Sequence, residues 1–176
     1  MTALTGLLAG GDRRSIGRVP EVVRLVRRDP RRSHELVAAL RHPDPVVRMR
    51  AADALEKASA ADPDLLRPHV RALLGLARRA TQQELRWHLA QMVPRLPLAP
   101  RQRRAAFGVL EGYLSDRSAI VRTFAMQALA DIAAADRALR PRVVRHLEHL
   151  TAGGTPAMPA RGRRLLAELG RERGAT

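Results

Sequence analysis

The sequence predicts an all-α protein, a right-handed α-solenoid of about five stacked helical hairpins. Its composition favours helices, because Ala and Leu dominate an apolar content of 45% while aromatic residues make up only 2%. One helix also occurs in two similar versions, DPVVRMRAADALEKASA at 44–60 and DRSAIVRTFAMQALADIA at 116–133. Apolar residues in these stretches recur at i, i+4, i+7 and i+8, which places one apolar stripe along each helix.

The repeat has a third, more divergent copy between these two. Val47-Arg48, Leu85-Arg86 and Val121-Arg122 each begin the same pattern, at nearly equal separations along the chain. Another amphipathic segment precedes each of these helices. The spacing is typical of stacked helical pairs, so we expect the repeating unit to be a hairpin of one outer and one inner helix.

This unit predicts the following elements along the chain. The outer helices are expected near residues 2–9, 31–41, 63–79, 99–114 and 138–150. The inner helices are expected near residues 13–28, 45–60, 82–95, 118–135 and 156–170. Pro20 interrupts the first inner segment, and Pro156 and Pro159 begin the last, so we expect both terminal units to act as caps that close the core.

A chain of 176 residues suits one ordinary domain, and we expect a single domain over residues 1–176. Its expected parts are an N-terminal capping unit (1–30), central repeats (31–150), a C-terminal capping helix (151–170) and a disordered tail (171–176).

The turn and stripe residues resemble those of the HEAT-repeat family, in which a turn carrying Asp is followed by Val-Arg and an Ala-Leu stripe. Asp44 with Arg48 and Asp116 with Arg122 match this pattern. The middle unit departs from it, with Thr-Gln-Gln at 81–83 in place of an acidic turn. The resemblance implies a solenoid of HEAT-like hairpins and no particular activity.

A physical reason for the Asp and Arg positions follows from helix chemistry. A carboxylate at the turn can cap the inner helix, whose first N–H groups and positive dipole end favour a negative charge. An arginine one turn into that helix can reach the carboxylate of its own or the neighbouring turn. We therefore predict a structural ladder along the stack, formed by Asp44, Arg48, Arg86, Asp116 and Arg122.

Helical geometry separates the two sides of each inner helix. If Val47 and Leu55 point inward, then Met49 and Asp53 point outward. The only tryptophan, Trp87, has the equivalent place in the next repeat, and an amphipathic aromatic with polar neighbours is typical of a binding hot spot. The alternative is that Trp87 packs between repeats as part of the core. The partner-binding residues predicted on the concave face are Met49, Asp53, Trp87, Gln91, Thr123 and Gln127.

No catalytic set is evident. The absence of cysteine excludes disulfides, thiolate metal sites and cysteine nucleophiles. The stretches AGGD and AGGT lack the lysine and the preceding strand of a phosphate-binding loop. His146 and His149 share a helix face but lack a third ligand, so we predict no metal site and no cofactor. We therefore expect a protein that is not an enzyme.

The charge balance bears on the partner. The formal net charge is +15, from 32 basic and 17 acidic residues, and such a field attracts acidic proteins, nucleic acid or anionic membrane. The bias towards arginine is also what a GC-rich genome would produce, so both readings stay open. We expect a scaffold or adaptor that binds a protein or peptide partner, of acidic character, along the concave face.

The alternative function is binding of the DNA backbone. In this second reading the chain resembles the alkylpurine DNA glycosylases built on HEAT-like repeats, with Trp87 and either Asp53 or Asp131 in a basic groove. Few aromatic residues are available to stack on bases, so nucleic-acid contacts are expected to reach the backbone only. No segment has the length and apolarity of a membrane span, the N-terminal segment does not have the pattern of a signal peptide, and we expect a cytoplasmic location.

Overall fold

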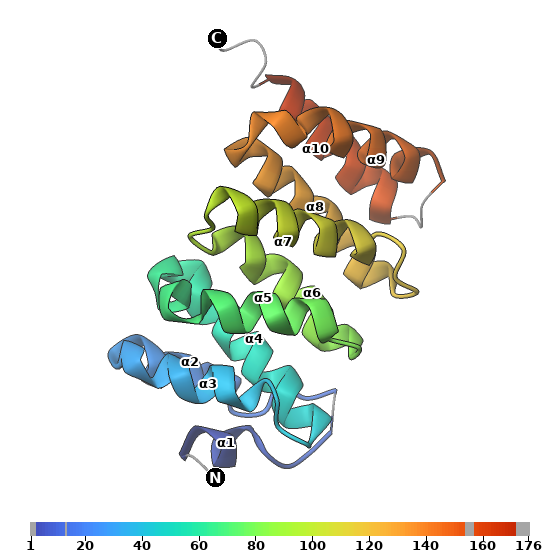
Figure 1. Cartoon of the computed structure of the whole chain (residues 1–176). Helices are drawn as coiled ribbons and strands as arrows, with labels where there is room; N and C mark the ends of the chain where they lie inside the picture. Colours follow the sequence, from blue (N-terminus) through green and yellow to red (C-terminus); the bar gives the residue numbers. More distant parts are fainter. Residues whose placement is uncertain (1–2, 13, 154–156, 172–176) are drawn as a thin grey trace. The chain divides into compact units, whose positions relative to one another are not determined.

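The computed structural model describes residues 3–12, 14–153 and 157–171, and Figure 1 traces the chain. These residues are predominantly helical, and no strand occurs among them, which confirms the predicted all-α class. None of the described helices is both long enough and apolar enough to cross a membrane. The expected tail beyond Arg171 and the expected helix start at Pro156 lie outside the described residues. The chain folds as two compact units, Met1–Leu98 (unit 1) and Ala99–Thr176 (unit 2).

Unit 1 contains six α-helices among its described residues. They are α1 (Ala3–Leu8), α2 (Val19–Arg28), α3 (Ser33–Ala39), α4 (Pro45–Ala61), α5 (Val70–Arg79) and α6 (Gln83–Met92). Three 3-10 turns lie between or after them, at Pro30–Arg32, Pro63–His69 and Val93–Arg95. The long helix α4 packs against α2, α3 and α6, so it lies at the centre of the unit (Figure 1).

Unit 2 is built in the same way from four described α-helices. They are α7 (Pro100–Tyr113), α8 (Ala119–Ala135), α9 (Arg140–Gly153) and α10 (Ala157–Arg171), with a 3-10 turn at Arg137–Leu139. Its long helix α8 packs against α7, α9 and α10, and α9 pairs closely with α10 (Figure 1). In each unit, a long Ala-rich helix therefore carries most of the contacts.

The apolar stripe lies where the sequence predicts it. Val47, Ala51 and Leu55 on α4 are fully buried, and so are Val121 and Ala125 on α8. Alanine at these positions allows neighbouring helices to approach closely, which suits a core with few aromatic side chains. The predicted inward face of the inner helices is confirmed.

Several predicted helices have different ends in the structure. The segment expected as a helix over 13–28 is helical only from Val19, because Pro20 lies in the first helical turn, where its missing N–H costs nothing. Gly17, just before this helix, has φ +54°, a conformation that favours glycine. The segment expected as a helix over 63–79 begins with a 3-10 turn through His69. Met49, expected to point outward, is 8% exposed.

An aspartate ends three of the helices in the same manner, a feature that the sequence reasoning missed. Asp29, Asp62 and Asp136 follow α2, α4 and α8, and each adopts φ near −140° and ψ near 90°. Each side chain then accepts a hydrogen bond from the backbone N–H two residues later, which starts the next 3-10 turn. The repeat is thus visible in backbone conformation as well as in sequence.

His69 provides a test of the packing between α3 and the turn Pro63–His69. Its ring is 5% exposed, its Nε2 lies 3.1 Å from the Ser33 hydroxyl, and its ring centroid is 4.5 Å from that of His34. Burial, and secondarily the positive charge of His34, lowers the pKa of His69 below its usual value of 6.5. The unfolded chain therefore binds more protons than the native state once the pH falls below about 6.5.

We expect the free energy of unfolding to fall as the pH is lowered from about 6.5 towards the lower pKa of folded His69. Above about pH 6.5, this contribution of His69 to the pH dependence should disappear. The measurement is urea unfolding, followed by circular dichroism, at several pH values between 5 and 8. His69→Gln should make the profile less steep, whereas His149→Gln, on an exposed position of α9, should preserve it. An equally steep profile in His69→Gln would contradict this assignment.

Candidate functional site: a pocket beside Trp87

A pocket of about 280 Å³ opens between α4 and α6 in unit 1. Its lining comprises Met49, Arg50, Asp53 and Lys57 from α4 and Glu84, Trp87 and His88 from α6. Most of these residues lie three or four positions apart on their helix, so each helix presents one face to the pocket. Ile16, which is 51% exposed, reaches the pocket from the loop before α2.

Three of the predicted partner-binding residues meet at this pocket. Met49, Asp53 and Trp87 all line it, and Trp87 is half-buried. Gln91 lies one turn further along α6, where its Nε2 donates to the Trp87 carbonyl at 3.3 Å. The structure thus places Trp87 at a surface pocket, with part of its ring packed against the protein.

The two other predicted residues lie on α8 in unit 2. Thr123 donates its hydroxyl proton to the Ala119 carbonyl at 2.8 Å. The Gln127 amide nitrogen donates to Asp131 at 2.9 Å, and its oxygen accepts from Arg161 at 3.2 Å and Arg164 at 2.9 Å. Gln127 therefore links α8 to α10 within its own unit.

Charged groups at and beside the pocket form a network that the sequence reasoning did not find. Lys57 Nζ lies 2.8 Å from Asp53 Oδ2, and Arg95 Nη2 lies 2.7 Å from Glu56 Oε1. Arg95 also donates to the Glu56 carbonyl and the Ser59 hydroxyl. In the sequence, the only feature that indicates this network is the i, i+3 spacing of Asp53 and Glu56 on one face of a predicted helix.

His88 lies beside this network and is 8% exposed. Its ring is tilted against Trp87, with ring centroids 5.6 Å apart. Burial lowers the pKa of His88 below its usual value, although the charges of Asp53, Glu56 and Glu84 act in the opposite direction. The imidazole is therefore neutral at pH 7, with a nitrogen lone pair to offer.

The predicted ladder residues occupy equivalent places, but the arginines bind carbonyl groups. Arg48, Arg86 and Arg122 each donate to the backbone carbonyl of the residue six positions earlier, at the turn before their own helix. For Arg48 and Arg122 the expected ion pair with Asp44 or Asp116 is thus replaced by bonds to the turn backbone. A guanidinium satisfies several carbonyls that the turn leaves without partners, which explains the preference.

The aspartates of the ladder act on N–H groups, as expected for caps. Asp44 Oδ1 accepts from Val46 N at 2.8 Å at the start of α4. Asp116 Oδ1 accepts from Ser118 N at 2.7 Å, and Ser118 is the cap of α8. The middle turn, which has Thr-Gln-Gln in place of an acidic turn, is linked to the start of α4 through Gln82. The Gln82 side chain accepts from Arg48 Nε and donates to the Pro45 carbonyl.

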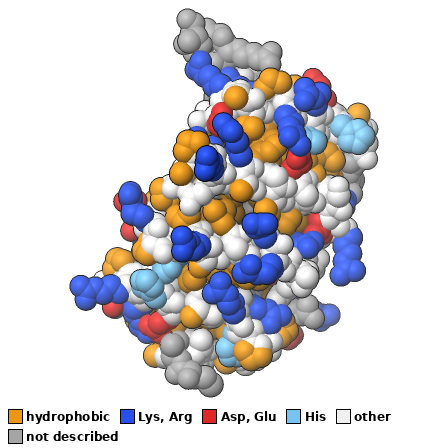
Figure 2. All heavy atoms as spheres, viewed as in Figure 1, with side chains coloured by type: hydrophobic (Ala, Val, Ile, Leu, Met, Phe, Trp, Pro, Cys, Tyr) orange, Lys and Arg blue, Asp and Glu red, His pale blue; other side chains and the backbone are white. Residues whose placement is uncertain are grey.

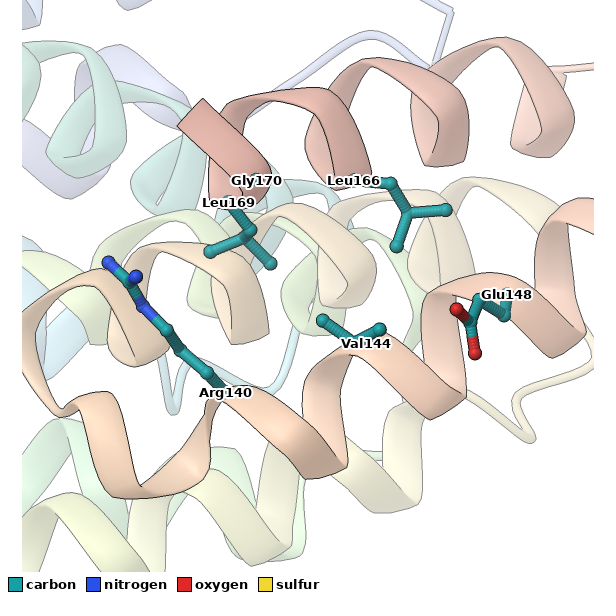
Figure 3. A pocket seen from close by; sticks show the side chains of 6 residues that line it. All are labelled: Arg140, Val144, Glu148, Leu166, Leu169 and Gly170. Atoms are coloured by element: carbon teal, nitrogen blue, oxygen red, sulfur yellow. The ribbon is translucent and has the colours of Figure 1, made fainter. Parts of the chain in front are cut away.

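A second cavity of about 260 Å³ lies between α9 and α10 in unit 2. Figure 3 shows the aliphatic side chains of Val144, Leu166 and Leu169 lining it, with Arg140 and Glu148 at its two ends. Arg140 is 7% exposed, whereas Glu148 is exposed to solvent. None of its residues belongs to the predicted partner-binding set.

Comparison with known proteins gives a likeness of fold. No protein-family model and no curated protein matches the chain. Among solved structures, the chain is similar to an engineered protein from a structural genomics consortium, with a TM-score of 0.60 and 20% sequence identity. The alignment covers 96% of this chain and 78% of that chain. At this level of identity the likeness concerns the fold alone.

Proposed function

We propose that this protein is a non-enzymatic binding module, a right-handed α-solenoid of HEAT-like hairpins that holds a protein or peptide partner on its concave face. The repeated arginine-to-carbonyl bonds and the repeated aspartate turns support the solenoid reading, because they place equivalent residues in equivalent conformations. The observation that carries the binding proposal is the pocket beside Trp87.

The pocket suits one side chain of a partner. Its volume of about 280 Å³ is at the small end of the range for small-molecule sites, roughly 300–1,000 Å³. Met49 and Trp87 supply an apolar wall, while Asp53 and Lys57 supply charged groups. A half-buried tryptophan with such neighbours has the make-up of an interface anchor.

The surrounding charge favours a partner with acidic character. Figure 2 shows Lys and Arg side chains spread over the face in view, with apolar side chains exposed between them. The formal net charge of +15 would steer an acidic protein towards the molecule and speed its association. In this proposal an apolar side chain of the partner enters the pocket, and acidic residues beside it meet the basic surface.

Trp87→Ala should weaken capture of the native partner by at least roughly tenfold, because truncating an anchor residue costs about 2 kcal/mol or more. The measurement is affinity purification from the source cells after nuclease treatment, with circular dichroism and thermal melting of each variant. Ile120→Ala is the matched control, since Ile120 is an exposed aliphatic residue in unit 2 and 49% exposed. If Trp87→Ala unfolds the protein, Trp87 is a core residue and the proposal fails.

Binding of the DNA backbone is the second candidate, and the excess of exposed arginine favours it. Arg71, Arg78 and Arg79 are exposed on α5, as are Arg27 and Arg28 at the end of α2. Partners lost on nuclease treatment would support this candidate. Contacts to six or more phosphates would also lower the affinity for generic duplex DNA by roughly a thousandfold between 50 and 200 mM salt.

A further inference from the structure

We propose that Asp53, Glu56 and His88 form a binding site for one divalent transition-metal ion beside the Trp87 pocket. One ligand atom from each of the three side chains can be chosen so that all lie within 4.8 Å of one another. Asp53 and Glu56 share a face of α4 at i, i+3, and His88 comes from α6, which packs directly on α4. Two rigid helices thus bring three ligands together.

The His88 ring gives an independent reason to place a ligand here. His88 is 8% exposed, and its Nδ1 is buried without a hydrogen-bond partner among the described residues. A buried polar nitrogen that bonds to nothing costs free energy, and native structures rarely leave one in that state. A metal ion at the pocket would use an imidazole nitrogen of this ring, in the neutral form that coordinates metals.

Each carboxylate is held through one oxygen and keeps the other for an ion. Lys57 bonds to Oδ2 of Asp53, and Arg95 bonds to Oε1 of Glu56. These two cations fix the orientation of the carboxylates, as the groups behind metal ligands commonly do. Oδ1 of Asp53 and Oε2 of Glu56 form no hydrogen bond with any described residue.

The ligand chemistry selects the class of metal. Two carboxylates and one imidazole suit first-row divalent ions such as Zn²⁺, Ni²⁺ or Co²⁺, whereas Ca²⁺ and Mg²⁺ prefer oxygen ligands throughout. Glu84 lines the same pocket one turn before His88. The pocket is open to solvent at its rim, so water can complete the coordination shell.

Trp87 provides a built-in probe for the test. It is the only tryptophan of the chain, and its ring centroid lies 5.6 Å from that of His88. The full chain, without a histidine tag and stripped with a chelator, is titrated with Ni²⁺ while tryptophan fluorescence is followed. We expect saturable quenching that fits one ion per chain and is reversed by the chelator. Calorimetry with Zn²⁺ should give the same stoichiometry.

Variants identify the ligands. His88→Gln and Asp53→Asn should each weaken Ni²⁺ affinity by at least roughly tenfold, because each removes a ligand, and even outer-shell changes cost 10–100-fold. His149→Gln, at an exposed position, should leave the affinity unchanged.

Two results would overturn the site: no saturable quenching up to millimolar Ni²⁺, or quenching that both variants retain in full. If circular dichroism shows that His88→Gln does not fold, the Asp53→Asn result decides alone. No partner is present in this titration, so its outcome is independent of the proposed protein binding.

Discussion

Arg50→Ala should lower the free energy of unfolding of unit 1 by about 3 kcal/mol or more, which is the largest effect we expect from any arginine of the chain. Arg50 on α4 is 2% exposed, and its guanidinium donates to four backbone carbonyls of the segment between α1 and α2. The four acceptors are the carbonyl oxygens of Leu8, Gly10, Asp12 and Ser15.

Hydrogen bonds to a charged group contribute roughly 1.5–3 kcal/mol each, and a full sum would overstate the loss, because the exposed carbonyls regain water when the arginine is removed. The glycines of this segment show how closely it follows Arg50. A Cβ added at Gly17 would lie 3.0 Å from the guanidinium carbon. The loop is therefore shaped around the arginine, and its order should be lost with the side chain.

Urea unfolding at pH 7.5 measures the change in stability, and trypsin cleavage after Arg14 and Arg18 reports on the loop. Arg50→Lys should be intermediate, because an ammonium group lacks the planar fork that reaches several carbonyls at once. Arg71→Ala, on an exposed position of α5, is the control and should change stability by less than about 0.5 kcal/mol. Equal urea midpoints for Arg50→Ala and Arg71→Ala would refute the proposed role.

Periodicity predicted the helices well and their ends less well, for physical reasons. The apolar stripe depends on spacing along one helix, so Val47, Ala51 and Leu55 were placed correctly inside. The start of an outer helix depends on how the preceding turn closes. Over so few residues, the 3-10 turns after Asp29 and Asp62 have the same apolar spacing as an α-helix, so spacing alone does not distinguish the two. Asp29 and Asp62 are recognisable as caps in the sequence, but aspartate caps were predicted only before the inner helices.

The candidate site was predictable only where it follows the repeat. Met49, Asp53 and Trp87 share a repeat position or lie one helical turn apart, so the repeat alignment brought them to one pocket. Arg50 was not identified, because an arginine on a helix normally extends into solvent and its acceptors lie in a loop far away in sequence. His88 was not singled out from the sequence, because Asp53 and Glu56 lie on another helix and neither segment shows which helix it packs against.

The repeat alignment also explains why the positions of the ladder arginines could be predicted and their carbonyl acceptors could not. It placed Arg48, Arg86 and Arg122 at equivalent positions, and the structure gives them equivalent acceptors. The sequence shows that a turn carries an aspartate, but it does not show which backbone carbonyls of the turn are left without a partner. An aspartate was therefore the expected partner of each arginine. In the middle unit Arg86 has the equivalent carbonyl bond although its own turn carries no aspartate.

Gly162→Ala should destabilise unit 2 by about 1–3 kcal/mol, because the added methyl group overpacks the contact between α10 and its neighbours. A Cβ at this position would lie 1.9 Å from Thr151 Oγ1, 3.2 Å from Thr151 Cβ and 3.3 Å from Met126 Cε. The Thr151 hydroxyl cannot move aside without loss, since it donates to the Leu147 carbonyl at 2.6 Å. Removing that oxygen in a Gly162→Ala, Thr151→Ala double variant should restore part of the stability.

The same substitution should have the opposite sign at Gly108 on α7. A Cβ there meets no atom within 4 Å, so alanine gains helix propensity and reduces the entropy of the unfolded chain, a benefit of about 0.5–1 kcal/mol. Thermal melting of the two variants separates the cost of overpacking at Gly162 from the gain in helix propensity, because the change in helix propensity is common to both sites. If Gly162→Ala melts above the parent protein as Gly108→Ala should, then α10 does not pack on α9 as closely as the structure places it.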